Sequence, residues 1–366
     1  MDHTAPTTSP AYPGLLEPTP AWATRTLRAA GALDDTRSVT DVTFGPVGSG
    51  QVADTLRCSL RYDGDVPSAP TSLILKSSAA DENSRAAGNR MGLYEREVRF
   101  YEQLAPAVTI RTPRCFHASL DDETGSFTLL MEDLSPAQAV DQFSGFTADH
   151  AATALAQLVG LHAPCWGNSA LGQQSWLSRG NRTTALIETA PRLMEQFVTR
   201  YQDVLEPEWL DVVRRLAPHY ACFTFDRPGP WTVCHGDYRP DNMLFAAAGG
   251  RVPLAVVDWQ TINRAPAMAD VAYVLGTGLD VRTRRDQEQS LLRSYHAALR
   301  AGGVRDYGWS QCWRDYRRFA CQAVYFAATA AMMVERTERG DSMFLAMIRR
   351  SAAHVVDLES EALLAD

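Results

Sequence analysis

Apolar and polar residues follow two different repeats along the chain. Up to residue 133, the apolar residues form short runs separated by turns that carry Gly, Pro or Asp, and such runs predict β-strands. Beyond residue 134 the apolar positions recur every three to four residues, which predicts amphipathic helices. The pattern therefore predicts an α+β protein, in which a small antiparallel sheet precedes a mainly helical region. The predicted strands cover residues 38–44, 54–62, 71–76, 115–120 and 126–131.

The strand region is also expected to contain helices. The Thr-Pro pair at residues 19–20 is typical of a helix start and predicts a helix over residues 21–30. A further helix is predicted over residues 91–104, and Glu97 falls on its apolar face. A carboxylate that faces a core needs a cation, because burying an unpaired charge is costly. Lys76, at the end of an apolar strand, is the expected partner of Glu97, although a strand-end lysine can also be simply solvated.

The helical region is predicted to begin with a helix from Thr147 to His162. We expect His162 to be a hydrogen-bonded core histidine, since no second metal ligand lies at helical spacing from it. The predicted organisation is a flexible arm over residues 1–18, a first domain over 19–133 and a second over 134–366. Further helices are predicted over residues 184–204, 208–220, 283–301, 311–338 and 342–364.

A group of polar residues among apolar runs carries the candidate chemistry. Asp237 is followed by Asn242, and Asp258 comes after two apolar runs that flank a glycine-containing turn, which predicts a β-hairpin. Asn242 and Asp258 each lie eight residues from Gly250, so a hairpin folded about Gly250 is expected to place them opposite each other. Two oxygen donors at neighbouring strand ends suit Mg²⁺, and an Asp beside them could accept a proton from an attacking hydroxyl. This combination predicts phosphoryl transfer.

Each of these motifs alone has an ordinary structural explanation. The His-Gly-Asp run at residues 235–237 could be a polar turn, and Asn242 could be the first residue of a strand; their combination at hairpin spacing favours the functional interpretation. The segment 45–51 is rich in glycine and lies between two predicted strands. It could be a plain turn, or its exposed N–H groups could cover phosphates. Its candidate phosphate-binding residues are Gly48, Ser49 and Gly50.

With these residues, the chain resembles the aminoglycoside phosphotransferase-like superfamily, which shares the protein-kinase fold, and most closely its ecdysteroid-kinase-like and choline-kinase-like branch. Residues 237–242 (Asp-Tyr-Arg-Pro-Asp-Asn) are similar to the Asp-Leu-Lys-Pro-Glu-Asn of protein kinases, with Gly236 in place of their Arg. Trp259 and Gln260 replace the Phe-Gly of protein kinases, and no Ala-Pro-Glu segment follows. The resemblance implies a two-lobed fold, a small antiparallel N-lobe with one main helix and a larger helical C-lobe, with Mg²⁺ and ATP bound in the cleft between them.

The resemblance also implies a role for individual residues. Asp237 would accept the proton of the attacking hydroxyl, and Arg239 would meet the charge of the transferred phosphate. Lys76, paired with Glu97, would hold the α- and β-phosphates. The other implied residues are Asn242 and Asp258 as metal ligands, Glu132 and Leu134 at a hinge whose backbone reads the adenine, and His235 and Asp270 as supports of the catalytic loop.

Composition narrows the possible partners and location. The 366 residues carry 35 Lys and Arg against 43 Asp and Glu, a net charge of −8 without a basic stripe, so nucleic acid is not an expected partner. The seven cysteines are scattered and lack a Cys-x-x-Cys spacing, which favours reduced thiols in a cytoplasmic protein. The N-terminus shows no export signal. The longest nearly apolar run, residues 319–334, is too short to span a bilayer and predicts a buried helix.

The acceptor is expected to bind the helical region. The predicted helix 311–338 is rich in aromatic residues and poor in carboxylates, whereas a polycationic aminoglycoside would need an acidic cleft. This favours a neutral or apolar alcohol, such as a steroid-, terpenoid- or acyl-like one. Two alternatives stay open: an aminoglycoside or amino-sugar kinase, and a nucleotide-binding pseudokinase that acts as a regulatory module. The candidate acceptor-binding residues are Trp313, Tyr325 and Phe326.

Overall fold

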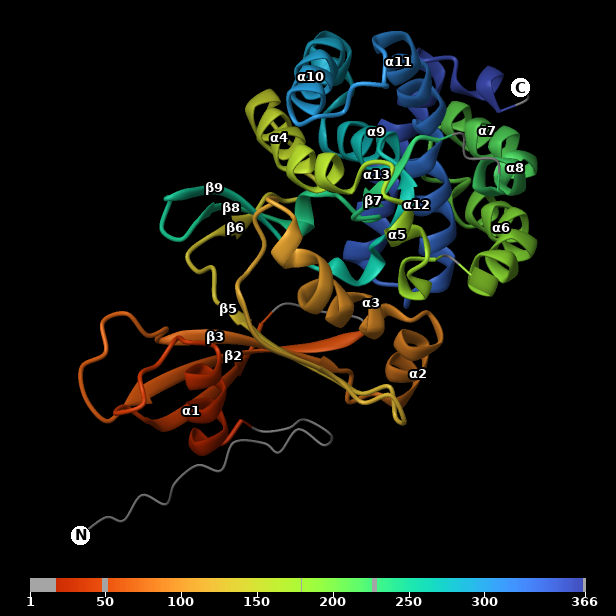
Figure 1. Cartoon of the computed structure of the whole chain (residues 1–366). Helices are drawn as coiled ribbons and strands as arrows, with labels where there is room; N and C mark the ends of the chain where they lie inside the picture. Colours follow the sequence, from red (N-terminus) through yellow and green to blue (C-terminus); the bar gives the residue numbers. More distant parts are fainter. Residues whose placement is uncertain (1–17, 48–51, 179, 226–228, 365–366) are drawn as a thin grey trace. The chain divides into compact units, whose positions relative to one another are not determined.

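The chain divides into two compact units, each of which is described by itself below (Figure 1). Unit 1 consists of the chain up to Glu102 together with Pro113–Asp133. Unit 2 consists of Gln103–Thr112 and the chain from Leu134 onward. Gly48, Ser49 and Gly50, which are predicted to bind phosphate, lie outside the described residues. The computed structural model describes residues 18–47, 52–178, 180–225 and 229–364.

Unit 1 is built on a five-stranded antiparallel sheet with the strand order β1-β2-β3-β5-β4. All five predicted strands form. The helix α1 (Pro20–Ala29) covers one face, where Leu27 packs into a cluster of buried residues that includes Leu73 and Leu75 of the sheet. The α1 helix begins as predicted, since the Thr19 side chain accepts a hydrogen bond from the backbone N–H of Trp22 at 3.2 Å. The strands are β1 (Val39–Pro46), β2 (Ala53–Tyr62), β3 (Ser72–Ser78), β4 (Cys115–Leu120) and β5 (Phe127–Glu132).

Two helices follow β3 where the sequence predicts one. The helix α2 (Glu82–Arg90) has few apolar residues and so offers no apolar face for a pattern to reveal. Gly92, with φ 59°, separates it from α3 (Leu93–Arg99), and the chain continues as a wider π-helical turn over Phe100–Leu104. The helix predicted over residues 91–104 is therefore correct in its centre and less regular at both ends.

Unit 2 is mainly helical, with short strands near its start and middle. The predicted helix from Thr147 forms, and Thr147 caps it by accepting a hydrogen bond from the backbone N–H of His150 at 3.2 Å. The strands are β6 (Gln138–Ala139), β7 (Trp231–Cys234), β8 (Met243–Ala247), β9 (Val252–Val256) and β10 (Asn263–Pro266). The helices are α4 (Ala148–Cys165), α5 (Ser169–Gly172), α6 (Gly180–Tyr201), α7 (Pro207–Leu216), α8 (Tyr220–Phe225), α9 (Met268–Gly278), α10 (Val281–Ala301), α11 (Trp309–Phe319), α12 (Cys321–Met333) and α13 (Glu338–Asp357).

The single helix predicted over residues 311–338 is wrong, because the chain forms α11 and α12 there. They meet at Ala320, whose N–H is shared between the carbonyls of Tyr316 and Arg317 at 3.2 and 3.4 Å. Such sharing loosens the helical ladder and allows the axis to change direction. The helix predicted over 342–364 likewise ends at Asp357, and a short 3-10 turn follows it. Among the described residues, no helix is long and apolar enough to cross a membrane.

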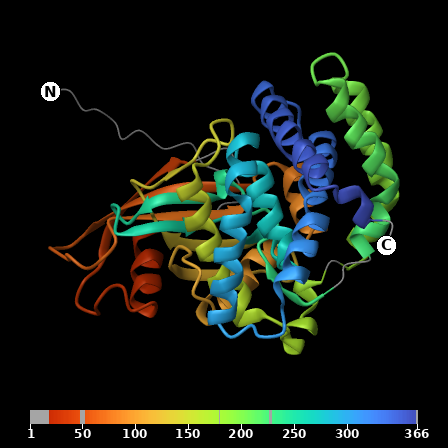
Figure 2. The ribbon, with the colours of Figure 1, turned by 90° about the horizontal axis from the view of Figure 1, so that it is seen from above.

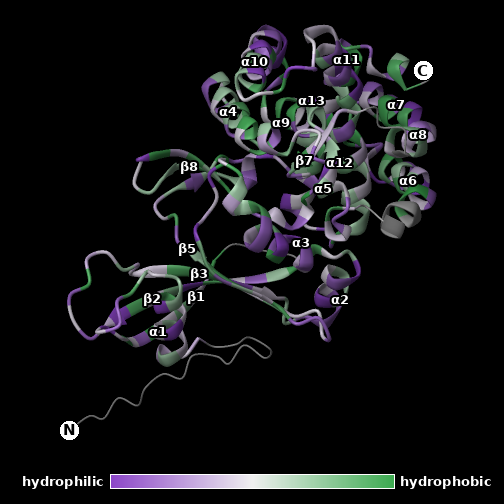
Figure 3. Cartoon of the chain, viewed as in Figure 1, coloured by the Kyte–Doolittle hydropathy of each residue, from purple (hydrophilic) through white to green (hydrophobic). Residues whose placement is uncertain are grey.

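Helix α9 forms the centre of unit 2. All its residues are buried, and α4 and α10 to α13 pack against it. Helices α4 and α10 run side by side (Figure 2). Much of α10 has the hydrophilic colour in Figure 3, because it carries many exposed polar residues. The helix α13 approaches closely at Gly276, where a Cβ would lie 2.5 Å from Nδ1 of His354. Because α9 is enclosed on several sides, it is a rigid base for the loops that it contacts.

Buried polar groups in unit 2 are joined in pairs and networks. Glu288 accepts hydrogen bonds from Arg284 and from the hydroxyl of Tyr316, both at 2.8 Å. Separately, Tyr307 donates its hydroxyl to Oδ2 of Asp315 at 2.8 Å, and both residues are buried. Burial raises the pKa of Asp315 to about 6, although the Tyr307 hydrogen bond acts in the opposite direction.

We predict that Asp315→Asn stabilises the protein at neutral pH. The pKa of Asp315 in the folded state, about 6, lies above its ordinary value of 3.8. The folded state therefore binds this proton more tightly than the unfolded chain does. In the wild-type protein, this proton contributes stability that is complete below pH 3.8 and is lost as the pH rises through 6. At neutral pH the wild-type protein therefore lacks this contribution. Asparagine can accept the Tyr307 hydrogen bond without a buried charge.

Urea unfolding should show a gain of about 2–3 kcal/mol at pH 7.5 that shrinks toward acidic pH. Asp306→Asn, a change at an exposed aspartate of the segment just before α11, is the control and should have little effect at any pH. A difference between Asp315→Asn and wild type that does not vary with pH would contradict the raised pKa.

Candidate active site

The predicted hairpin of β8 and β9 forms, but its register differs from the predicted one by one residue. The backbone N–H of Val257 donates to the carbonyl of Asn242 at 3.0 Å, so Asn242 lies opposite Val257 and not opposite Asp258. The reason is that the turn centres between residues 249 and 250 instead of at Gly250. A shift of one residue normally sends a side chain to the other face of a strand. Asp258 has left the strand by this point and adopts a left-handed backbone, with φ 66°.

Asp237 lies in the loop between β7 and β8, where three side chains hold its carboxylate. Its Oδ1 atom accepts a hydrogen bond from the Tyr273 hydroxyl at 2.9 Å. Its Oδ2 atom accepts hydrogen bonds from Nε of Arg239 and Nδ2 of Asn242, each at 3.1 Å. The structure therefore brings Asp237, Arg239 and Asn242, three residues predicted from the sequence, into one hydrogen-bonded group.

Arg239 stays charged in this group. It also donates to Asp241 at 2.8 Å, so it joins two carboxylates. Burial acts against its charged form, but the charges of Asp237 and Asp241 outweigh this effect and raise the pKa of the guanidinium. The side chain is thus a fixed cation next to the candidate base.

Asp270 holds the backbone that leads into this loop. Its carboxylate accepts hydrogen bonds from the backbone N–H groups of His235 at 2.7 Å and Gly236 at 3.0 Å. Gly236 has φ 87°, and a Cβ there would approach the carbonyl oxygen of Thr261 to 2.4 Å, so the turn requires glycine. His235 accepts from the N–H of Asp237 at 3.3 Å and contacts the carbonyl oxygen of Val257 at 3.0 Å through its other ring nitrogen. Asp270 and His235 contact the loop in the way expected of supporting residues.

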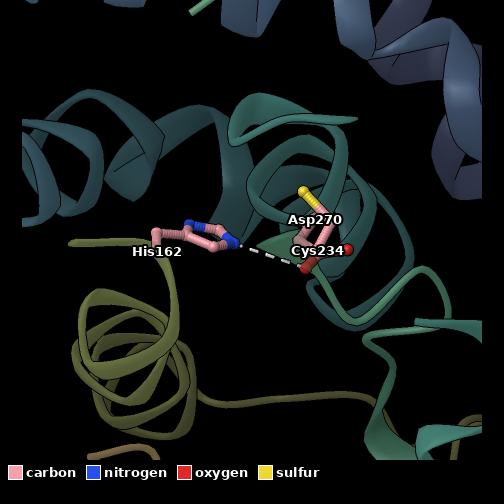
Figure 4. A group of neighbouring side chains, drawn as sticks. All are labelled: His162, Cys234 and Asp270. Carbon is pink, nitrogen blue, oxygen red and sulfur yellow. Dashed lines mark hydrogen bonds and ion pairs between the residues drawn. The ribbon is translucent and has the colours of Figure 1, made fainter. Parts of the chain in front are cut away.

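His162, Cys234 and Asp270 lie close enough to ligate a metal, but their hydrogen bonds give them a structural explanation (Figure 4). His162 contacts the Tyr295 hydroxyl at 2.7 Å and Asp270 at 3.4 Å. The Cys234 thiol donates to two backbone carbonyls of β10, at 3.5 and 3.7 Å. Asp270 is already engaged by the loop N–H groups. His162 is a satisfied core histidine, as predicted, and all three residues are buried.

Asn242 and Asp258 have donor atoms that suit Mg²⁺. The amide nitrogen of Asn242 donates to the backbone oxygen of Asp237 at 2.9 Å as well as to its carboxylate, which orients the amide. Among the described residues, no donor engages Oδ1 of Asn242. Asp258 is half-buried and accepts a hydrogen bond from Gln260 at 3.0 Å. One amide oxygen and one carboxylate are oxygen ligands of the kind that Mg²⁺ prefers, so the two residues fit the metal.

Lys76 and Glu97 form an ion pair within unit 1, which confirms the predicted partnership. Nζ of Lys76 lies 2.6 and 2.9 Å from the two carboxylate oxygens of Glu97. The Lys76 side chain is 12% exposed and that of Glu97 is 2% exposed, so the pair is largely withdrawn from water. Such a pair depends on both partners, because either charge alone would be costly to bury.

Glu132 and Leu134 lie at the end of β5 and just beyond it. Glu132 pairs with the backbone of Arg114, donating at 2.8 Å and accepting at 3.0 Å through its side chain. Leu134 is buried against Ala247 and Ala255 in unit 2. Their roles in reading an adenine stay predictions.

Two of the three predicted acceptor residues have contacts that do not lead to Asp237. Tyr325 is buried, and its hydroxyl donates to the carbonyl oxygen of Leu216 at 3.0 Å. The ring of Trp313 stacks on that of Trp309 within α11, with 6.1 Å between ring centroids. These contacts are typical of core and helix-surface packing.

Phe326 and Met343 have contacts that do lead to the candidate base. The ring of Phe326 meets that of Tyr273 edge to face, with 5.4 Å between centroids. The sulfur of Met343 lies 3.1 Å from Nη1 of Arg239. Both side chains are half-buried, so part of each remains open to a ligand. Met343 and Tyr273 were not singled out from the sequence; the available signal for Tyr273 is its position three residues after Asp270, on one face of a helix.

A family comparison agrees with this arrangement. The ecdysteroid kinase-like family model matches residues 48–305, which is most of the chain. The chain belongs to the ecdysteroid kinase-like family. This membership confirms the resemblance seen in the sequence and places the chain among kinase-like small-molecule phosphotransferases.

The curated relatives of this chain are distant in sequence. The chain is 23% identical, over 264 residues, to an uncharacterized oxidoreductase of Caenorhabditis elegans, covering 66% of this chain and 32% of that protein. The chain spans 32% and 23% of the lengths of the first two curated relatives that it matches.

Solved structures support the fold. The ethanolamine kinase of Plasmodium vivax is 10% identical with a TM-score of 0.54, covering 93% of this chain and 89% of that chain. The GDP complex of a mutant aminoglycoside 2′-phosphotransferase is 14% identical with a TM-score of 0.50, covering 93% of this chain and 96% of that one. The predicted α+β, kinase-like fold is confirmed.

We predict that Glu97→Gln destabilises the protein by about 3 kcal/mol, because it leaves the largely buried charge of Lys76 without its counter-charge. Glu95→Gln is the matched control, since Glu95 is on the same helix but less buried, and it should cost less than about 0.5 kcal/mol. The measurement is the free energy of unfolding in urea at pH 7. Equal effects of the two changes would show that the Lys76–Glu97 pair contributes nothing specific.

Proposed function

We propose that this protein transfers the γ-phosphate of ATP to a hydroxyl group of a small molecule, using Mg²⁺. The observation that carries the proposal is the hydrogen-bonded group of Asp237, Arg239 and Asn242. It combines a carboxylate able to accept a proton, a fixed cation and an oriented amide oxygen. Membership of a family of kinase-like phosphotransferases gives the same reaction class.

Each residue of this group has a separate task in the proposed reaction. Asp237 binds the acceptor hydroxyl, orients it toward the γ-phosphate and receives its proton. Arg239 stabilises the negative charge that develops on the phosphate oxygens. Asn242 and Asp258 would hold Mg²⁺, which neutralises phosphate charge when bound.

Lys76 would supply the second fixed cation. The salt bridge to Glu97 limits the movement of its Nζ atom, so the charge is available at a defined place on unit 1. A positioned cation of this kind holds the α- and β-phosphates of a nucleotide in kinases. Phosphoryl transfer depends mostly on such positioning and on charge neutralisation.

We further propose that the acceptor is a neutral or apolar alcohol. The half-buried side chains that connect to Asp237 through Tyr273 and Arg239 are those of Phe326 and Met343, and both are apolar. The carboxylate of Asp241 is already paired with Arg239. An aminoglycoside carries several ammonium groups and would lose their hydration on binding unless carboxylates replaced it. Phe326 and Met343 would instead bind a hydrocarbon body next to the reacting hydroxyl.

The acceptor proposal is tested by nucleoside diphosphate release with a set of alcohols and MgATP or MgGTP. In the series 1-butanol, 1-hexanol and 1-octanol we expect kcat/KM to rise with chain length, since each buried methylene contributes up to about 0.8 kcal/mol. Geraniol and oestradiol extend the set to terpenoid and steroid alcohols. Kanamycin A should be a poor acceptor. Saturable phosphorylation of kanamycin A, without turnover of any of the alcohols, would favour the aminoglycoside-kinase alternative.

The metal assignment is tested by Asp258→Ala. We expect this change to abolish Mg²⁺-dependent binding of ATP, because it removes the charged member of the proposed ligand pair. Calorimetric titration with ATP, in excess Mg²⁺ and again in EDTA, measures the effect. Asp286→Ala, at an exposed aspartate of α10, is the control and should bind like wild type. Unchanged affinity of Asp258→Ala in Mg²⁺ would contradict the assignment.

A further inference from the structure

The hydrogen bonds of Asp237 leave one accepting position open. An ionised carboxylate can accept about four hydrogen bonds, roughly two at each oxygen. Its Oδ2 atom receives two, from Arg239 and Asn242. Its Oδ1 atom receives one, from the Tyr273 hydroxyl. Within the described part of the chain, no other donor reaches this carboxylate. The open position is therefore on Oδ1, beside the hydroxyl of Tyr273.

Tyr273 is held firmly in this place. It is 1% exposed, it lies in the fully buried helix α9, and the ring of Phe326 packs against its ring edge to face. Asp270, three residues earlier on the same helix, binds the backbone N–H groups of residues 235 and 236. A single rigid helix thus fixes the backbone before Asp237 through Asp270 and the carboxylate of Asp237 through Tyr273.

We infer that Tyr273 is a positioning residue for phosphoryl transfer, whose hydroxyl fixes the Asp237 carboxylate so that the acceptor hydroxyl binds at the open side of Oδ1. The inference rests on the proposed function. In the reaction, the acceptor oxygen forms a bond to the γ-phosphorus while the bond from that phosphorus to the β–γ bridging oxygen breaks. The nucleoside diphosphate leaves with the electron pair, and the acceptor proton passes to Oδ1. Tyr273 neither gains nor loses a proton.

The surroundings of Tyr273 keep it in the protonated form that this role requires. Burial, together with the negative charge of Asp237, raises the pKa of the phenol well above its usual range. The hydroxyl is therefore a permanent donor at neutral pH and cannot serve as the base. Without this hydroxyl, hydrogen bonds would hold the Asp237 carboxylate only at Oδ2. The carboxylate could then rotate, and Oδ1 would move away from the position in which it orients the acceptor hydroxyl toward the γ-phosphate.

The test is Tyr273→Phe, with Tyr307→Phe as the matched control. Both tyrosines are buried and both donate to an aspartate, at 2.9 Å to Asp237 and at 2.8 Å to Asp315. The measurements are kcat and KM for MgATP with the best alcohol of the set above, hydrolysis of MgATP by water alone, and the Kd for MgATP by calorimetry. We expect Tyr273→Phe to lower kcat about 10- to 100-fold, the effect of a hydrogen bond to a charged group, with little change in the Kd for MgATP. Tyr307→Phe should lose stability but retain kcat.

A double variant separates positioning from a general structural effect. In an Asp237→Asn background, Tyr273→Phe should lower the residual turnover by less than about twofold, because both changes act through one carboxylate. An unchanged or increased kcat of Tyr273→Phe, an equal loss in Tyr307→Phe, or full additivity with Asp237→Asn would overturn the inference. If wild type turns over none of the alcohols, kanamycin A or water, the proposed function fails and the inference fails with it. If wild type is active and Tyr273→Phe is equally active, the inference alone fails.

Discussion

The buried carboxylate of Asp270 is the constraint on which the loop of Asp237 depends. This side chain is 1% exposed, and an ionised carboxylate in such a place needs donors that replace water. Two of its donors are the backbone N–H groups of residues 235 and 236. If the loop moved away, the buried carboxylate would lose both of these donors and, among the described residues, keep only its 3.4 Å contact with His162, at a cost of several kcal/mol. Loop conformations that take these N–H groups away from Asp270 are therefore disfavoured. This fixes the position of Asp237 in addition to the hydrogen bonds that Asp237 makes itself.

Much of unit 1 and the main residues of the loop could be predicted from the sequence, because their signals are local. Short apolar runs between turns give all five strands of the sheet. A carboxylate on an apolar helix face requires a cation, and Lys76, at the end of an apolar strand like the third-strand lysine of kinases, is the candidate that the structure confirms as the partner of Glu97. The spacing of Asp237, Asn242 and Asp258 likewise predicts a hairpin with polar ends. In each case the signal lies in a few neighbouring residues, and for Lys76 and the loop residues the resemblance to kinases adds to it.

What the sequence misses depends on contacts between distant segments or on turn geometry. The register of β8 and β9 differs by one residue because the turn, in which Ala248, Gly249 and Gly250 adopt positive φ, centres between residues 249 and 250. The break at Ala320 follows from hydrogen-bond sharing that no local residue type signals. In the sequence, Tyr273 cannot be told from an ordinary aromatic core residue. The fold shows that its hydroxyl donates to the carboxylate of Asp237, 36 residues earlier in the chain. Acceptor residues are hardest to predict, since aromatic side chains serve both packing and binding.

For the proposed function, the arrangement would separate the chemical step from the choice of acceptor. Asp237 is tied to the buried helix α9 through Tyr273 and, by way of the loop backbone, through Asp270, so a substitution that moves α9 disturbs both attachments. Phe326 and Met343 belong to α12 and α13 and are only half-buried, so replacing them with other apolar residues removes less packing. In the proposed reaction, a change of shape at these two positions would therefore alter which alcohol fits without altering how Asp237 receives the proton of its hydroxyl. On this scaffold, differences in acceptor between related proteins are expected to lie on α12 and α13, while the loop anchored by α9 keeps the reaction the same.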